Sequence, residues 1–377
     1  MAVLCVLLCF EFSACRGRDF AKAMPPLKSA TADTLLVFRS ADEYSPKTPR
    51  LHFVDPTTGA GTELDRKTPS QIAAVLAEPH IVYGSYAVTK QGKFARLVPD
   101  EEMQSGHIDS HADSLLSPDG RHFLRRVPGK VVIADIDGST ALLLKDDFSE
   151  CAWRTAAVFV CLAGKYQETR AIAEYDLNSR KKQILHSITG KHKLENLRLR
   201  PDGKTAAFTQ NLADSVTVQL WDFSAQSVRT LAEFKGRYIF DLAISADGIV
   251  AARIVNSKHA EGKLDPYDLW ISAPYGSATS AGYLLNLPSL DSPGFFSGRG
   301  FTGVDSFAFS PDSNSLAILM SGEDDCRMAD EGGNLACRKD IYVVERNIPG
   351  MRRLTEFQIT SAAKLRWLKF SFTPRLK

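Results

Sequence analysis

The chain has 377 residues, of which 44% are apolar and 24% charged, so it can bury a sizeable core and is neither disordered nor membrane-embedded throughout. Its 46 basic and 44 acidic side chains leave a net charge of +2, which argues against a dedicated nucleic-acid-binding protein, because such proteins carry a basic stripe. With 25 glycines and 18 prolines, the composition also excludes a collagen-like or low-complexity chain.

The N-terminus has the features of an export signal. The apolar run from Ala2 to Phe10 has the length of the hydrophobic region of a signal peptide and is too short to span a bilayer as a helix. It is followed by Phe12-Ser13-Ala14-Cys15, which resembles the lipobox of bacterial lipoproteins, where the cysteine is lipidated. We therefore expect a signal peptide over residues 1–15 with Cys15 as the lipidation site, a tether over 16–33, and a folded domain over 34–377. The alternative for the leader is a buried first strand.

One four-residue phrase recurs along the folded part. It occurs at residues 117–120, 200–203, 245–248 and 310–313, as Ser-Pro-Asp-Gly, Arg-Pro-Asp-Gly, Ser-Ala-Asp-Gly and Ser-Pro-Asp-Ser. Stretches of alternating apolar residues flank each copy, which is the pattern of a β-hairpin. Proline presets φ for a type I turn, and glycine at the last position accepts a positive φ. The aspartates are therefore predicted to form turns and to have no catalytic role: Asp119, Asp202, Asp247 and Asp312.

The spacing of the phrase predicts a repeat of about 42 residues. Asp202 and Asp247 are close to one unit apart, and Asp119 and Asp202 close to two, with a degenerate copy at residues 152–160 between them. A second hairpin follows each turn, as at residues 219–223 and 340–344. Four short antiparallel strands per unit are typical of the blade of a β-propeller, in which the blades stack to bury both faces.

The phrase at residues 307–312, continued by 340–344 and closed by Arg352-Arg353-Leu354-Thr355, resembles the repeat of TolB-type propellers, the WD40-like repeat proteins of the bacterial periplasm. The resemblance implies an all-β fold with a single propeller of four-stranded blades. Blades are expected near residues 67–100, 107–148, 150–187, 192–234, 238–290 and 300–357. A seventh combines residues 34–64 with a strand from 365–372, so that both chain ends close the ring. Six blades are the alternative if residues 67–100 are only a connector.

Four cysteines of the folded part fall in two close pairs, Cys151 with Cys161 and Cys326 with Cys337. Even numbers of cysteines at short separations in an exported chain predict disulfides. Reduced core cysteines remain an alternative, above all for Cys151 and Cys161, which flank apolar strand residues. A zinc site fits less well, because neither pair has the two-residue spacing of a zinc knuckle.

Two polar clusters are candidates for binding. His107 and His111 are four residues apart and form a weak candidate metal site, since oligogalacturonate lyases, which share this propeller type, hold a metal through propeller histidines. Polar loop histidines are the alternative. The longest insertion is acidic, which suits a partner-binding loop or a divalent cation such as calcium. Its candidate residues are Asp324, Asp325, Asp330 and Glu331. The other long connections are 256–267 and 289–300.

The chain lacks the sequence signatures of common catalytic sites: it has no Gly-x-Ser-x-Gly elbow, phosphate loop or dinucleotide fingerprint. We expect a non-enzymatic, monomeric propeller of the bacterial cell envelope that binds a protein or peptide through its loop face or channel. No cofactor and no nucleic-acid partner are expected. It would lie in the periplasm or on the outer membrane, with a lipid anchor as its only membrane contact. The alternative is a metal-dependent enzyme, such as a polysaccharide lyase, with histidines at the channel mouth and a divalent cation.

Overall fold

The computed structural model describes residues 34–42, 45–64, 80–83, 86–89, 94–96, 115–119, 121–127, 130–135, 141–144, 148–164, 169–190, 192–256, 268–272, 283–284, 302–328, 335–346, 348, 351–355 and 365–369. The regular elements within these residues are all strands. The described part of the chain therefore contains no helix that could cross a membrane. The predicted signal peptide, Cys15 and the tether lie outside the described residues.

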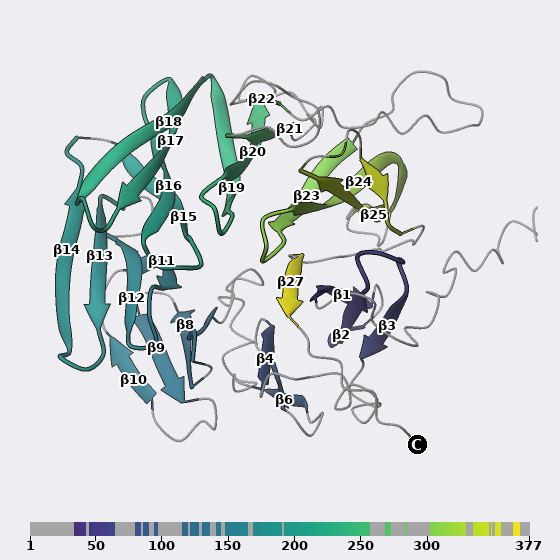
Figure 1. The fold of residues 1–377 in the computed structure, drawn as a ribbon, viewed down its shortest axis with the longest axis horizontal. Helices are drawn as coiled ribbons and strands as arrows, with labels where there is room; N and C mark the ends of the chain where they lie inside the picture. Colours follow the sequence, from purple (N-terminus) through teal and green to yellow (C-terminus); the bar gives the residue numbers. More distant parts are fainter. Residues whose placement is uncertain are drawn as a thin grey trace, which may run out of the picture.

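The described strands form seven antiparallel sheets that follow one another in chain order around the molecule (Figure 1). They are sheet A, β27 (Arg366–Lys369), β1 (Thr34–Asp42), β2 (Ser45–Val54) and β3 (Gly61–Leu64); sheet B, β4 (His80–Tyr83), β5 (Tyr86–Thr89) and β6 (Phe94–Arg96); sheet C, β7 (Leu115–Leu116), β8 (His122–Val127), β9 (Lys130–Asp135) and β10 (Ala141–Leu144); sheet D, β11 (Phe148–Trp153), β12 (Val158–Ala163), β13 (Ala171–Asp176) and β14 (Lys181–Ser187); sheet E, β15 (Lys193–Leu199), β16 (Thr205–Asn211), β17 (Ser215–Asp222) and β18 (Ser227–Lys235); sheet F, β19 (Arg237–Ile244), β20 (Val250–Asn256), β21 (Asp268–Ile271) and β22 (Tyr283–Leu284); and sheet G, β23 (Thr302–Phe309), β24 (Ser315–Met328), β25 (Leu335–Glu345) and β26 (Arg352–Arg353).

This arrangement confirms the predicted all-β propeller with four-stranded antiparallel blades. The C-terminal strand β27 pairs with β1, with Leu36 opposite Trp367 and Thr34 opposite Lys369. An early strand, β1, and the C-terminal strand, β27, therefore share sheet A, as the sequence predicted. The total of seven blades and the closure of the ring stay predictions, and sheet B, from the weakest predicted blade, has three described strands.

The repeated phrase forms the predicted hairpin turns. In sheet F, the main-chain N–H of Ser245 donates to the carbonyl of Ile249 at 2.8 Å. Gly203 and Gly248 have φ values of 69° and 91°, and in the last copy Ser313 takes the same left-handed conformation with φ 61°. This conformation favours glycine, since it brings a Cβ atom close to the backbone.

The core lies between neighbouring sheets. Leu162 of β12, Leu194 of β15 and Phe208 of β16 belong to one buried cluster, and each is 0% exposed. Sheets D and E therefore contribute to a shared core, as expected of blades that cannot bury both faces alone. The third strands contribute Trp221 and Trp270, which are each 4% exposed and pack in such clusters.

Candidate functional site

The first strands of sheets D to G share one irregularity. We call β11, β15, β19, β23 and β27 the inner strands, because consecutive ones contact each other and β15, β19, β23 and β27 face the middle of the molecule (Figure 1). Each of β11, β15, β19 and β23 carries a bulge where it pairs with the second strand. A polar residue lies at or beside each bulge, four positions before the first residue of the turn. These residues are Glu150, Asn196, Asp241 and Ser306.

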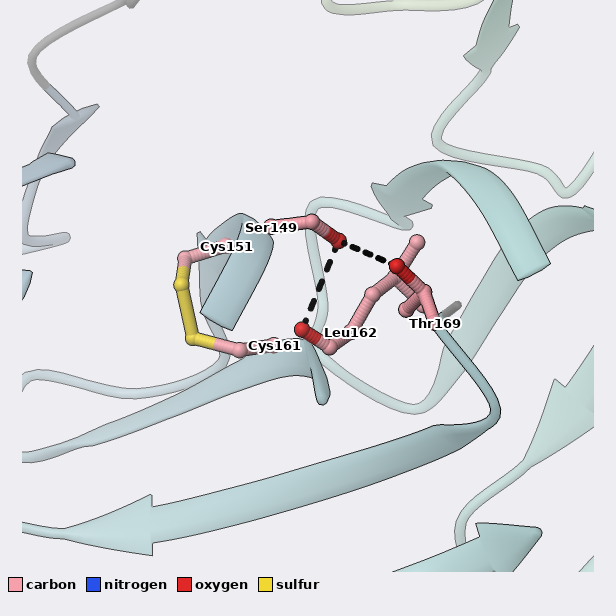
Figure 2. Close-up of a disulfide and its surroundings, with 5 residues drawn as sticks. All are labelled: Ser149, Cys151, Cys161, Leu162 and Thr169. Carbon is pink, nitrogen blue, oxygen red and sulfur yellow. Dashed lines mark hydrogen bonds between the residues drawn. A yellow bond between two sulfur atoms is a disulfide. The ribbon is translucent and has the colours of Figure 1, made fainter. Parts of the chain in front are cut away.

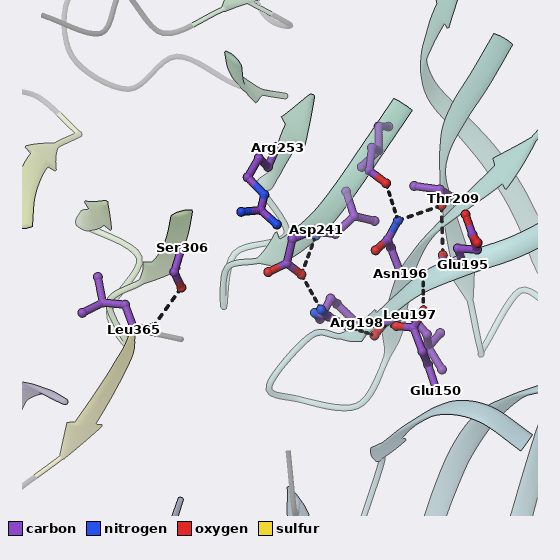
Figure 3. Close-up of polar contacts among 12 residues, drawn as sticks. Glu150, Glu195, Asn196, Leu197, Arg198, Thr209, Asp241, Arg253, Ser306 and Leu365 are labelled. Atoms are coloured by element: carbon purple, nitrogen blue, oxygen red, sulfur yellow. Dashed lines mark hydrogen bonds and ion pairs between the residues drawn. The ribbon is translucent and has the colours of Figure 1, made fainter. Parts of the chain in front are cut away.

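Three of these side chains connect their own sheet to the main chain of the next (Figure 3). Glu150 of sheet D accepts from the main-chain N–H of Asn196 in sheet E at 2.7 Å. The side-chain amide of Asn196 in turn donates to the carbonyl of Ile239 in sheet F at 3.0 Å. The main-chain N–H of Leu365, directly before β27, donates to Oγ of Ser306 in sheet G at 2.9 Å.

Between sheets F and G the connection comes from the second strand. The guanidinium of Arg253 in β20 donates to the carbonyls of Val304 and Asp305 at 3.1 and 2.7 Å. The main-chain links therefore run from sheet D to sheet A. We call Glu150, Asn196, Arg198, Asp241, Arg253 and Ser306 the inner belt.

The charges of the inner belt compensate one another. Arg198 lies between two carboxylates: it is 3.2 Å from Glu150 and also pairs with Asp241 of the next sheet. The Arg198 and Glu150 side chains are 29% exposed and Asp241 is 15% exposed, so water reaches them. These pairs connect the side chains of sheets D, E and F, in addition to the main-chain links. We therefore assign the inner belt a structural role.

Two exposed aromatic side chains stand beside this belt on β19. Tyr238 is 57% and Phe240 is 49% exposed, whereas Ile239 between them is 7% exposed. Phe240 is the extra residue of the β19 bulge, and the Arg253 guanidinium lies 5.6 Å from the centre of its ring. The other exposed large apolar residues of the described part, Leu143, Ile184 and Ile348, lie away from the inner strands. Tyr238, Phe240 and Arg253, which we call the aromatic site, combine apolar area with a cation.

The topology brings the long connections of sheets F and G to one edge. In a four-stranded antiparallel sheet, the connections from strand two to three and from strand four to the next sheet leave at the same end. The connections between β20 and β21, β22 and β23, and β24 and β25 are of these kinds. The first two cover most of the predicted segment 256–267 and all of 289–300. The acidic insertion was predicted as a loop, but its residues Asp324 and Asp325 belong to strand β24. The connection from β18 to β19, directly before Tyr238, ends at the same edge. We call this edge the loop face.

The first cysteine pair forms the predicted disulfide (Figure 2). Cys151 of β11 is directly opposite Cys161 of β12, and their Cα atoms are 4.0 Å apart. The structure thus contains the bridged form of this pair and not the reduced one. A bridge over 10 positions contributes about 3 kcal/mol in the chain-entropy model.

Most other predicted site residues fall outside the part that the structure describes. His107, His111, Asp330 and Glu331 are among them. Asp324 and Asp325 belong to strand β24, and Cys326 of the same strand is directly opposite Cys337 of β25. For these four residues the structure describes the backbone and not the side chains. No group of three or more His, Cys, Asp or Glu side chains within the described residues could hold a metal ion.

The aromatic site was not among the residues predicted from the sequence. Tyr238-Ile239-Phe240 is a run of three apolar residues, which is expected of a first strand with both faces buried between blades. The bulge that exposes Phe240 has no sequence signature, because it depends on the pairing of β19 with β20. Aromatic residues on both sides of Ile239 were the available signal.

Comparison with known proteins supports the fold only. No family model and no curated protein matches the chain. A hypothetical selenium-binding protein from Sulfolobus tokodaii is 14% identical, with a TM-score of 0.53 over 92% of this chain and 97% of that chain. A manganese complex of oligogalacturonate lyase is 11% identical, with a TM-score of 0.49 over 79% and 83%. A putative TolB from Agrobacterium tumefaciens is 10% identical, with a TM-score of 0.44 over 89% and 98%. At these identities the likeness concerns the fold and carries no activity to this chain.

Proposed function

We propose that this chain is a non-enzymatic propeller of the bacterial cell envelope that binds a protein partner by an extended peptide segment. The observation that carries the proposal is the aromatic site, where Tyr238 and Phe240 remain exposed on an inner strand next to Arg253. The loop face, where the long connections of sheets F and G emerge, lies at the same end of β19 as Tyr238.

The composition of the aromatic site suits protein recognition. Tyrosine, phenylalanine and arginine are enriched at the centres of protein interfaces, and tyrosine and arginine supply much of the binding energy. Covering half-exposed rings of this size contributes about 25 cal/mol for each Å² of apolar surface removed from water, before the entropic cost of association is subtracted. Arg253 is already oriented by the carbonyls of Val304 and Asp305, so little side-chain entropy is lost when a ligand contacts it.

Site-specific photo-crosslinking tests this proposal directly. A photoreactive phenylalanine analogue is placed at Tyr238 or Phe240 in the full chain, expressed in cells that export it. The matched control is Ile184, which is 51% exposed but lies on the outermost strand β14. We expect one discrete protein adduct from positions 238 and 240, identified by mass spectrometry, and none from 184. Equal adducts from all three positions, or none from 238 and 240, would contradict the proposal.

Elemental analysis of the purified full chain addresses the enzymatic alternative. The binding function predicts no stoichiometric divalent metal. A stoichiometric ion that is lost in the His107→Ala, His111→Ala variant would instead favour the metal-dependent lyase.

The location is proposed on the basis of the leader sequence. Export through residues 1–15, lipidation at Cys15 and a tether over residues 16–33 would hold the propeller at a membrane surface in the envelope. Metabolic labelling with a palmitate analogue should label the chain, and Cys15→Ser should abolish the label. Retention of the label in that variant, or a chain that stays in the cytoplasm, would overturn this assignment.

A further inference from the structure

The longest hairpin of the described chain extends sheet G beyond its neighbours. β24 has 14 residues and β25 has 11, whereas the described second and third strands of sheets D and E have 6 to 8. The start of β24 and the end of β25 are integrated into sheet G: Leu316 and Ile318 are 0% exposed, and Ser315 is opposite Glu345. We call the outer residues of the two strands, 321–328 of β24 and 335–339 of β25, the ribbon; they lie on the side of the hairpin that faces the loop face.

The hydrogen-bonded register is interrupted inside the ribbon. Ser321 is opposite Lys339, and the next opposed pair is Cys326 with Cys337. Four residues of β24, 322–325, therefore face the single residue Arg338 of β25. Because strand register is set by continuous pairing and by burial, an interruption of this size lets the outer part slip relative to the sheet. A covalent link at the first pair beyond the interruption would prevent that.

The bridged pair in sheet D has the same placement. The register of β11 and β12 is interrupted between Phe148 and Cys151, and Cys151 with Cys161 is the first opposed pair beyond it. That pair carries a disulfide. Directly opposed residues of an antiparallel pair have Cα separations within or near the range that a disulfide spans. The same placement at Cys326 and Cys337 therefore satisfies the backbone requirement for a bridge.

We propose that Cys326 and Cys337 form a second disulfide, which fixes the register of the ribbon. One cysteine thiolate attacks a disulfide oxidant, such as glutathione disulfide, and releases one thiol of the oxidant. The other cysteine then displaces the second thiol from the mixed disulfide, so that two cysteine thiols are oxidised and one oxidant disulfide is reduced. This inference concerns the ribbon's own chemistry and stands whether or not the proposed partner exists.

Peptide mapping of the full chain tests the bridge. Trypsin cleaves after Arg327 and Arg338, so Cys326 and Cys337 fall on different peptides, 300–327 and 328–338. The purified chain is equilibrated with a mixture of reduced and oxidised glutathione, alkylated and digested without reduction. We expect the two peptides to remain joined and to separate after reduction. The Cys151–Cys161 pair, which trypsin also divides by cleaving after Arg154, is the internal control.

The Cys326→Ser variant is the control that removes one partner of the proposed bridge. It should leave Cys337 alkylated and the bridge between Cys151 and Cys161 intact, which shows that the variant is folded in sheet D. Alkylated Cys326 and Cys337 in the wild-type chain after equilibration, glutathione mixed disulfides on either, or a bridge from either to another cysteine would overturn the proposal.

Discussion

The side-chain amide of Asn196 donates to the main-chain carbonyl of Ile239, 3.0 Å away on the inner strand of the next sheet. Asn196 is 8% exposed, and its backbone has a φ of 59°, a conformation that asparagine tolerates better than most residues. The same nitrogen also donates to Oγ1 of Thr209 at 3.2 Å. One buried amide therefore joins sheets E and F and completes the bulge of β15.

Asn196→Ala should destabilise the protein by about 2 to 3 kcal/mol, because it leaves buried acceptors unpaired and places alanine in a left-handed conformation. Urea unfolding measures the change. Asn196→Gly removes the same hydrogen bonds without the backbone penalty, so it should be about 1 kcal/mol less damaging than alanine. Equal stability of Asn196→Ala and the wild type would show that the hydrogen bonds of Asn196 contribute nothing to the free energy of unfolding.

Gly203 should tolerate no side chain. Its φ is 69°, and a Cβ atom would lie 2.5 Å from the main-chain oxygen of Arg154 in sheet D. Gly248 occupies the same position of the repeated phrase with φ 91°, but there a Cβ would meet only the guanidinium of Arg200 at 3.9 Å. Both alanine variants carry the left-handed penalty of about 1 kcal/mol. Gly203→Ala should cost about 1 to 3 kcal/mol more, because backbone must shift. A thermal-unfolding comparison in which the two variants match would exclude the predicted clash.

Removal of strand β27 should unfold part of sheet A. A chain ending at residue 362 loses Leu365, which is 3% exposed, and Trp367, whose indole N–H donates to the carbonyl of Ala308 at 2.9 Å. It also uncovers Leu36, which is 0% exposed. We expect a loss of at least about 3 to 5 kcal/mol, the range for deleting large buried side chains. Trp367→Phe is the milder control, since it keeps the strand and removes the hydrogen bond. A truncated chain that melts like the wild type would refute the predicted ring closure.

His186 should make the protein less stable in mild acid. Burial lowers the pKa of His186 below its ordinary value of 6.5, and its ring packs against Trp221 with centroids 5.6 Å apart. The unfolded chain therefore binds a proton there more readily than the folded chain, and stability falls as pH decreases through 6.5 toward the folded pKa. Urea midpoints at pH 7.5 and 5.5 should differ less in His186→Gln than in the wild type. If the midpoints at the two pH values differ as much in His186→Gln as in the wild type, other groups cause the loss of stability in acid.

The sequence predicted the repeating part of the fold better than the candidate site. The turn phrase specifies its own local geometry, so the hairpins at Gly203 and Gly248 followed from residue type and spacing. Spacing also predicted a bridge between Cys151 and Cys161, with reduced core cysteines as the alternative. The aromatic site did not, because the exposure of Phe240 depends on how β19 pairs with β20. The histidines His107 and His111 lie outside the described residues, so their predicted metal site stays a prediction.

The links along the inner strands have a consequence for how the repeats can vary. Three of them join a side chain of one repeat to a peptide group of its neighbour: Glu150 to the N–H of Asn196, Asn196 to the carbonyl of Ile239, and Ser306 to the N–H of Leu365. Arg198 differs, because it pairs with the side chains of Glu150 and Asp241 in the two neighbouring sheets. Every amino acid supplies a carbonyl, and all but proline supply an N–H. At these three links a substitution in one module therefore demands no compensating substitution in the next, whereas Glu150, Arg198 and Asp241 depend on one another's side chains.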